Sequence, residues 1–124
     1  MIGSRSAPKP REGAWLWLFK IVAGLMIVLL LALHFIVNHL VAPSGLLSYQ
    51  DVIVYYQNPI IPIVEVIFLI FVVSHALVGL RSIVLDLNPS DGVLRLVDAV
   101  FWLAGTGFII YGIWLVVVIT QQGA

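Results

Sequence analysis

Three long apolar runs constrain this chain more than any other feature of its sequence. They cover residues 14–42, 59–85 and 93–120. Each run is longer than the ~20 residues that a helix needs to cross a bilayer at about 1.5 Å of rise per residue. Backbone groups in lipid must find hydrogen-bond partners within their own segment, so each run is expected to be a helix. The sequence therefore predicts an all-α membrane protein whose three transmembrane helices lie within residues 14–120.

The composition agrees with a membrane protein and excludes several kinds of site. Of the 124 residues, 62% are hydrophobic and only 10% are charged, whereas soluble domains carry roughly 25% charged residues. Six basic residues balance six acidic ones, so no nucleic-acid partner is expected. The chain has no cysteine, which excludes disulfides, thiolate metal sites and iron–sulfur clusters within it.

The segments between the runs predict the topology. Residues 1–13 are expected to form a cytoplasmic N-terminal tail. The first run is too long for the core of a signal peptide, so it should remain as a spanning helix. "SYQDVIVYYQNP" (48–59) contains three tyrosines and predicts a short interfacial helix, and "DLNPSDG" (86–92) predicts a tight connection. Basic residues flank the start of the first helix and the second connection, whereas residues 43–58 contain none; the basic residues are Arg5, Lys9, Arg11, Lys20, Arg81 and Arg95. The positive-inside rule therefore predicts that the N-terminus and residues 86–92 face the cytoplasm, or the matrix in an organelle, and that the C-terminus faces outside. We expect a multi-pass protein of the cell inner (cytoplasmic) membrane.

Two histidines lie within the predicted spans, His34 in the first and His75 in the second. An ionisable group at that depth costs several kcal/mol unless it has a partner, so it is either bonded to a neighbouring helix or serves as a ligand. Few carboxylates and no thiols make a poor zinc site, whereas imidazole suits haem iron. Arg81 lies about 9 Å beyond His75 along the helix and could meet a haem propionate or extend to the lipid headgroups. His39 lies nearer the outer surface and is expected to be interfacial.

The depths of the two histidines predict how many haems they serve. Counted from residues 42 and 59, His34 lies about 12 Å below the outer helix end and His75 about 24 Å below it. Two axial imidazoles on one iron must lie within about 4 Å of each other. His34 and His75 should therefore serve different haems, and each should share its haem with a histidine of a second chain.

The remaining polar and small residues have weaker assignments. Glu65 lies near the outer interface and could relay protons, and Asp86 ends the second helix. Arg95 and Asp98 are expected to pair three residues apart at the start of the third helix. "AGTG" (104–107) and Gly112 predict a face of the third helix that packs closely against a neighbour.

The stretch "HALVGLRSIVLD" (75–86) and the first-helix pattern "LFKIVAGLMIVLLLALH" (18–34) resemble the small membrane-anchor subunits of succinate:quinone oxidoreductase (succinate dehydrogenase), respiratory complex II. The resemblance covers residues 14–120. It implies a non-catalytic anchor that packs with a second membrane-anchor subunit into a haem-binding bundle and holds an iron–sulfur and a flavoprotein subunit.

The resemblance also implies residue roles: His75 would ligate the inner haem b and His34 the outer one. Arg81 would be a cofactor-binding residue, Gly79 would leave room for the porphyrin or a helix, and Asp86 would be a candidate for the quinone site. Family members often carry Tyr after this Asp, where the chain has Leu87, so the resemblance assigns no quinone contact there. Lys20, four residues before Gly24, also departs from the family spacing.

Three alternatives remain open from the sequence. The chain could be the anchor of a fumarate reductase, which the sequence does not separate from a succinate dehydrogenase. It could be a haem-free structural or assembly subunit whose histidines only bridge helices. It could also belong to a small transporter or channel that uses Glu65 and His75 as a proton relay.

Overall fold

The computed structural model describes residues 13–36, 39–40 and 47–124, and this part of the chain is helical. The helices are α1 (Ala14–Ile36), α2 (Tyr49–Tyr55), α3 (Ile60–Asp86) and α4 (Asp91–Gln122). The three long helices are each apolar and long enough to cross a membrane. Three long apolar helices are present as predicted, although α4 begins two residues earlier and ends two residues later than expected. The predicted end of the first helix at residue 42 lies outside the described residues.

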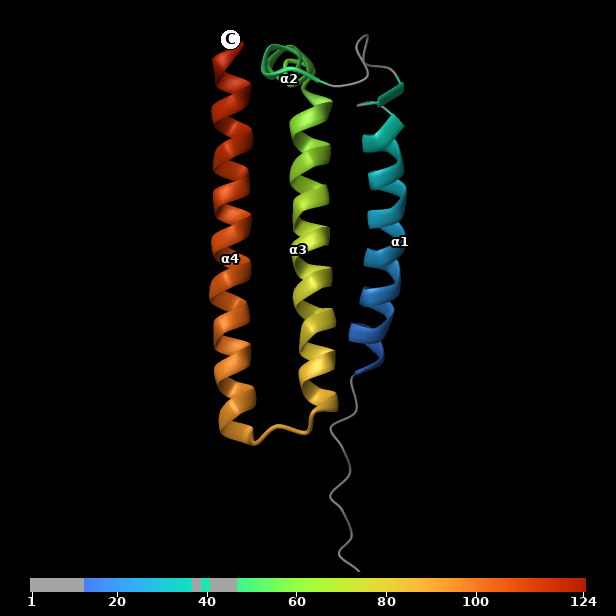
Figure 1. The fold of residues 1–124 in the computed structure, drawn as a ribbon, viewed down its shortest axis with the longest axis vertical. Coiled ribbons are helices and arrows are strands. Elements are labelled where there is room, and N and C mark those ends of the chain that lie inside the picture. The colour runs from blue at the N-terminus through green and yellow to red at the C-terminus, as the bar shows by residue number, and fades with distance from the viewer. Residues whose placement is uncertain (1–12, 37–38, 41–46) are drawn as a thin grey trace, which may run out of the picture.

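The long helices lie side by side, and α3 packs against both α1 and α4 (Figure 1). Two glycines bring α3 and α4 together: a Cβ on Gly105 would collide with the Leu77 side chain, and one on Gly112 with the Leu69 side chain. The predicted small-residue face of the last helix is confirmed for these two positions. Gly107 is not part of that contact, because nothing lies within 4 Å of where its Cβ would be.

The short helix α2 was predicted at this place and lies across the ends of α3 and α4 (Figure 1). It begins with a capping box, in which the Ser48 side chain accepts from the Asp51 backbone and the Asp51 carboxylate accepts from the Ser48 backbone at 2.8 Å. The Tyr49 hydroxyl is hydrogen-bonded to Gln122, and the Gln57 amide donates to the Thr120 carbonyl at 3.3 Å. These bonds hold α2 to the end of α4.

The connection between α3 and α4 is as tight as predicted. Asn88 has φ 53°, a left-handed conformation that asparagine tolerates better than most residues. Ser90 then caps α4 by accepting a hydrogen bond from the Val93 backbone at 3.4 Å. The chain therefore reverses within a few residues and places α3 and α4 antiparallel.

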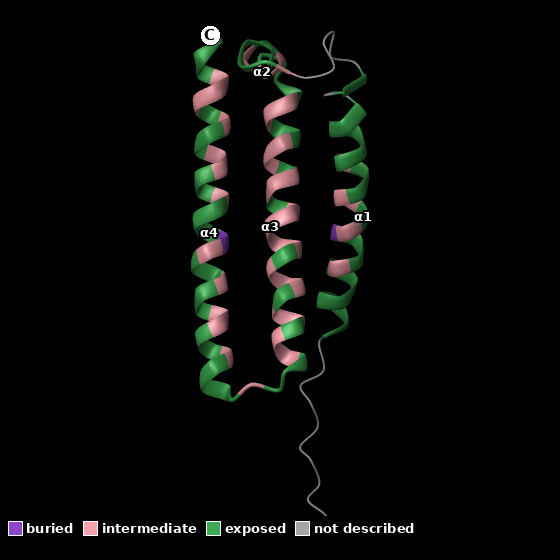
Figure 2. Ribbon diagram, viewed as in Figure 1, coloured by how far each residue is buried: buried purple, intermediate pink, exposed green. Residues whose placement is uncertain are grey.

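Large apolar side chains face outward along all three long helices. Trp102 is 78% exposed and Leu103 is 76% exposed, and among the described residues only Ala23 and Gly105 are buried. Figure 2 shows exposed residues along the whole length of each helix. A surface this apolar is suited to lipid or to other membrane subunits, not to water.

Candidate functional site

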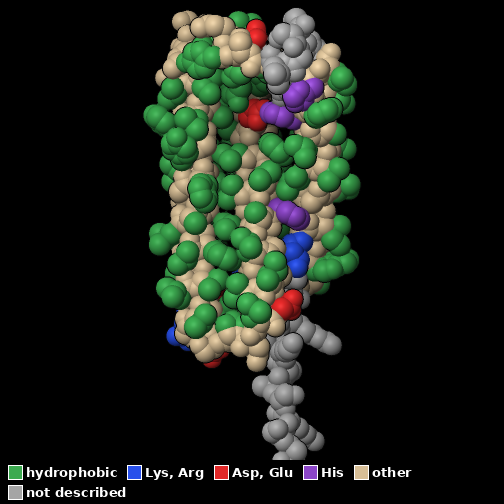
Figure 3. Space-filling model, viewed as in Figure 1, with side chains coloured by type: hydrophobic (Ala, Val, Ile, Leu, Met, Phe, Trp, Pro, Cys, Tyr) green, Lys and Arg blue, Asp and Glu red, His purple; other side chains and the backbone are tan. Residues whose placement is uncertain are grey.

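The chemistry-bearing side chains lie along the contact between α1 and α3, which we call the α1–α3 seam. Figure 3 shows the histidines gathered over these two helices together with acidic and basic side chains. The contacts that define the seam join Lys20 to Ser82, Gly24 to His75, and His34 to Glu65. In the last two contacts the residue numbers have the same sum, 99, as expected for two antiparallel helices in fixed register.

His75 lies in the middle of the seam, against α1. A Cβ on Gly24 would lie 3.2 Å from the His75 Cε1 atom, so the imidazole occupies the space that this glycine leaves. The Nδ1 atom of His75 is buried and has no hydrogen-bond partner in the structure. A buried polar atom without a partner is costly and calls for an explanation, such as a ligand.

His34 lies on the same seam but has different neighbours. Its Nδ1 atom is 3.3 Å from the Oε1 atom of Glu65 on α3. Its ring also stacks on Phe68, one turn further along α3, with ring centroids 6.4 Å apart. His34 is therefore held between a carboxylate and an aromatic ring of the neighbouring helix. Sequence reasoning assigned Glu65 no partner, although the same depth counting places Glu65 about 9 Å and His34 about 12 Å below the outer helix ends.

The register of the seam gives the separation of the two imidazoles along the membrane normal. His75 is level with Gly24, and His34 follows Gly24 by ten residues, or about 15 Å of helix. The sequence predicted about 12 Å. At this separation the two imidazoles cannot ligate the same iron, because the two ligating atoms of a bis-histidine iron lie within about 4 Å of each other.

A cation lies at the other end of the seam. The Lys20 ammonium donates a hydrogen bond to the Ser82 hydroxyl at 3.0 Å, and that hydroxyl also donates to the Val78 carbonyl at 3.1 Å. Ser82 follows His75 by seven residues, almost two full turns, so both lie on one face of α3. Sequence reasoning did not select Ser82, and the seven-residue spacing from His75 is the signal that would have found it.

Arg81 points to a different helix. Its guanidinium binds both carboxylate oxygens of Asp98 on α4, at 2.7 and 3.2 Å. The predicted pairing of Asp98 with Arg95 is therefore wrong. Asp98 instead faces α3, where the planar guanidinium of Arg81 binds both of its oxygens.

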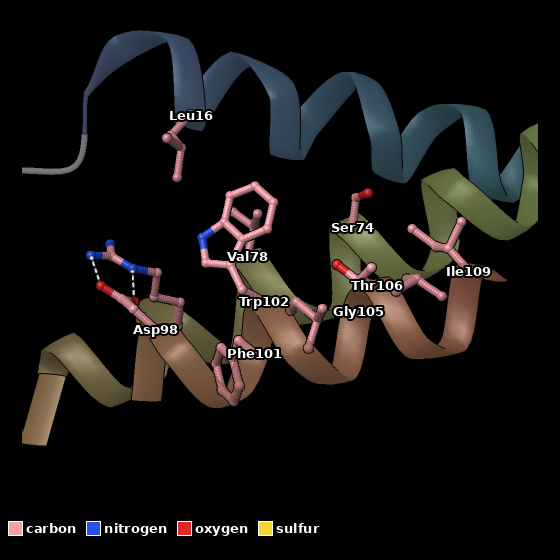
Figure 4. Close-up of a pocket in the computed structure, with 12 residues that line it drawn as sticks. Leu16, Ser74, Val78, Asp98, Phe101, Trp102, Gly105, Thr106 and Ile109 are labelled. Atoms are coloured by element: carbon pink, nitrogen blue, oxygen red, sulfur yellow. Dashed lines mark hydrogen bonds and ion pairs between the residues drawn. The ribbon is translucent and has the colours of Figure 1, made fainter. Parts of the chain in front are cut away.

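The Arg81–Asp98 pair closes one end of a groove of about 500 Å³. The groove is lined by α3 and α4, with Leu16 contributed by α1, and Figure 4 shows Leu16 and Trp102 pointing into it from opposite sides. Ser74 and Thr106 add hydroxyl groups to its otherwise apolar wall. His75 does not line this groove.

Two further predicted residues lie at the helix ends. Asp86 is the last residue of α3 and is exposed, as expected for a group at the membrane surface. His39 lies beyond α1, with its ring 4.8 Å from that of Phe35. Near the opposite end of α3, burial and then the Glu65 charge raise the pKa of Tyr56 to about 12.

The potential ligands among the described residues suit the iron of a haem better than a metal ion held by side chains alone. No group of three or more His, Asp or Glu residues that could hold a metal ion occurs in the described ranges. Single imidazoles at two depths, one with an unpartnered buried nitrogen, provide one axial ligand each, and haem needs no more than that from one chain.

Comparisons with known proteins identify the family. Residues 4–120 match the family described as "Succinate dehydrogenase/Fumarate reductase transmembrane subunit". A curated relative from Archaeoglobus fulgidus, named "Succinate dehydrogenase hydrophobic membrane anchor subunit", is 32% identical over 99 residues, which are 80% of this chain and 84% of the relative. No solved structure gives a significant match. With three apolar helices long enough to span a bilayer, this chain belongs to the succinate dehydrogenase/fumarate reductase transmembrane subunits and is a non-catalytic membrane-anchor subunit.

Proposed function

We propose that this anchor subunit supplies one axial ligand to each of two haems b, His75 to the inner haem and His34 to the outer one. The observation that carries the proposal is the pair of imidazoles on one seam, about 15 Å apart along the helices. When bound, haem supplies one-electron transfer, and two haems at these depths would conduct electrons across the membrane. The chain itself contributes ligation, orientation and exclusion of water.

A partner subunit follows from the same geometry. A bis-histidine iron needs a second imidazole within about 4 Å of the first, and His34 and His75 are too far apart to provide it for each other. The second ligand of each haem would come from a second anchor subunit packed against the seam. An iron–sulfur and a flavoprotein subunit would dock on the side of residues 86–92, which the positive-inside rule predicts to be the cytoplasmic side.

Two cations of this chain are candidates for the propionates of the inner haem. Lys20 is favoured, because Lys20 and Ser82 lie on the seam that holds His75, about two turns from it. Arg81 already binds both oxygens of Asp98 on another helix. Arg81 would then contribute mainly by holding α3 to α4. Asp86, exposed at the end of α3, remains the candidate for a quinone contact at the inner surface.

The test is the haem count of the purified whole complex, measured as the pyridine haemochrome. The wild type should contain two haems per complex, and His75→Ala and His34→Ala should each leave one. Lys20→Met should lower inner-haem retention more than Arg81→Met does. A wild-type count of one would refute the assignment of His34, and an unchanged count in His75→Ala would refute the assignment of the inner haem.

A second function has one observation in its favour. The His34–Glu65 and Lys20–Ser82 contacts join α1 to α3 directly, as expected of a structural anchor whose polar side chains bridge helices. A reduced-minus-oxidised spectrum without a b-type α-band in the purified complex would select this function. The proton relay between Glu65 and His75 has no such support, since the register places them ten residues, about 15 Å, apart on α3.

A further inference from the structure

A carboxylate inside a membrane-spanning helix requires a specific explanation. Glu65 is the one carboxylate of α3 before its last residue, and its side chain is only 19% exposed. A charged group at such a position is costly unless a partner compensates it. Its Oε1 atom lies 3.3 Å from the His34 Nδ1 atom, so the carboxylate is placed against one particular nitrogen of the imidazole.

The choice of nitrogen has a chemical consequence. A neutral imidazole carries one N–H, and a carboxylate at Nδ1 keeps the hydrogen there, because it can only accept. The Nε2 atom then carries the lone pair that a metal needs. Ligating histidines usually donate their other N–H to a carboxylate or carbonyl, which fixes the tautomer and the ring orientation and makes the imidazole more basic.

We infer that Glu65 is a positioning residue for His34: it accepts the Nδ1–H, fixes the imidazole as an Nε2 ligand, and strengthens its donation to the iron of the outer haem. The inference rests on the proposed function, since it requires His34 to ligate that haem. A more electron-rich axial ligand stabilises the ferric state over the ferrous state. Glu65 should therefore lower the midpoint potential of the outer haem.

Two features of the seam separate this role from simple helix bridging. The His34 ring has a second support, Phe68, whose ring lies at 25° to it; Phe68 can orient the imidazole but cannot accept its proton as a carboxylate does. His75 has no hydrogen-bond acceptor at its buried Nδ1, so this chain provides no comparable carboxylate to the proposed ligand of the inner haem. An effect of Glu65 should consequently be confined to one haem.

The experiment is a redox titration of the purified complex, followed at the α-band, with the wild type compared to Glu65→Gln. Glutamine keeps the size and an acceptor oxygen but removes the charge. The potential of the outer haem, identified as the component that His34→Ala removes, should rise while the inner one stays unchanged. Each tenfold loss of preference for the ferric state corresponds to about 59 mV for a one-electron couple.

Phe68→Leu is the matched control, because it removes the other support of the same ring without removing charge. It should lower the occupancy of the outer haem without shifting its potential upward. If Glu65→Gln does not retain the outer haem, Glu65→Asp replaces it: the shorter side chain keeps the charge but lengthens the bond, and a smaller upward shift is expected.

The outcomes distinguish the inference from the proposed function. Two haems with unchanged potentials in the Glu65 variant that retains them would refute the inference and leave the ligand assignments intact. An equal shift of both haems would also refute it, because a general loss of charge would then be the cause. A single haem in the wild type would refute the assignment of His34 to an outer haem. It would also refute the role inferred for Glu65, which depends on that assignment.

Discussion

Replacing Gly24 with alanine tests the closest approach of α1 to the proposed ligand His75. The new Cβ would lie 3.2 Å from the imidazole Cε1 atom, whereas carbon atoms pack best at about 3.5–4.0 Å. The ring or α1 must therefore move by about 0.3–0.8 Å. Overpacking of this kind costs about 1–3 kcal/mol, which corresponds to roughly 5- to 150-fold weaker retention of the inner haem at 1.36 kcal/mol per tenfold.

The assay is the rate at which the purified complex loses haem to an excess of an apo-haemoprotein, together with the haemochrome count. Gly24→Ala should accelerate loss of the inner haem and leave the outer haem in place. The helix itself should not suffer, because alanine is a better helix former than glycine. Gly107→Ala is the control, since nothing of this chain lies within 4 Å of that Cβ.

Two results would refute the reasoning. If Gly24→Ala retains both haems at the wild-type rate, the contact between Gly24 and His75 does not position a ligand. If the variant loses the outer haem instead, the register in which His75 is level with Gly24 is wrong. A loss of helicity by circular dichroism would show that the variant acts on folding and not on the position of His75.

Three further predictions concern the rest of the fold. A double-mutant cycle of Arg81→Gln and Asp98→Asn should give a coupling free energy of unfolding of about 1–3 kcal/mol, between the values for surface and buried pairs, because the two side chains are 34% and 36% exposed. A coupling near zero would contradict a bidentate pair. Gly112→Ala should lower the melting temperature of the complex, because its Cβ would crowd three atoms of the Leu69 side chain, including the branching Cγ, and an unchanged melting temperature would contradict this packing of α3 on α4. Hydrogen bonds from Ser48 hold the pKa of Asp51 below its ordinary value of 3.8, so the Asp51 cap contributes fully above pH 3.8 and is lost as the pH falls through the lower folded pKa. The protection factors of the α2 amides, which are corrected for the intrinsic pH dependence of exchange, should fall over that range in the wild type and stay constant in Asp51→Asn.

The sequence alone predicted the spans because length and apolarity are properties of each segment. Lipid admits only internally bonded helices, so three apolar runs give three helices whatever their neighbours are. The short helix within residues 48–59 and the turn at residues 86–92 were predictable for a similar reason, since their signals lie within a few residues of one another. The depths of His34 and His75 followed from counting along a helix of known rise.

Only the tertiary structure decided which side chains meet across the helices. A step of one residue turns a side chain by about 100° around the helix axis, so Arg81 and Ser82 have nearly the same depth but face α4 and α1, respectively. Depth counting cannot separate them. The spacing of three residues along one helix assigned Asp98 to Arg95, whereas the structure pairs it with Arg81. The rotation of each helix is fixed by packing, here by Gly24 on His75 and Gly105 on Leu77, and such contacts join residues far apart in the chain.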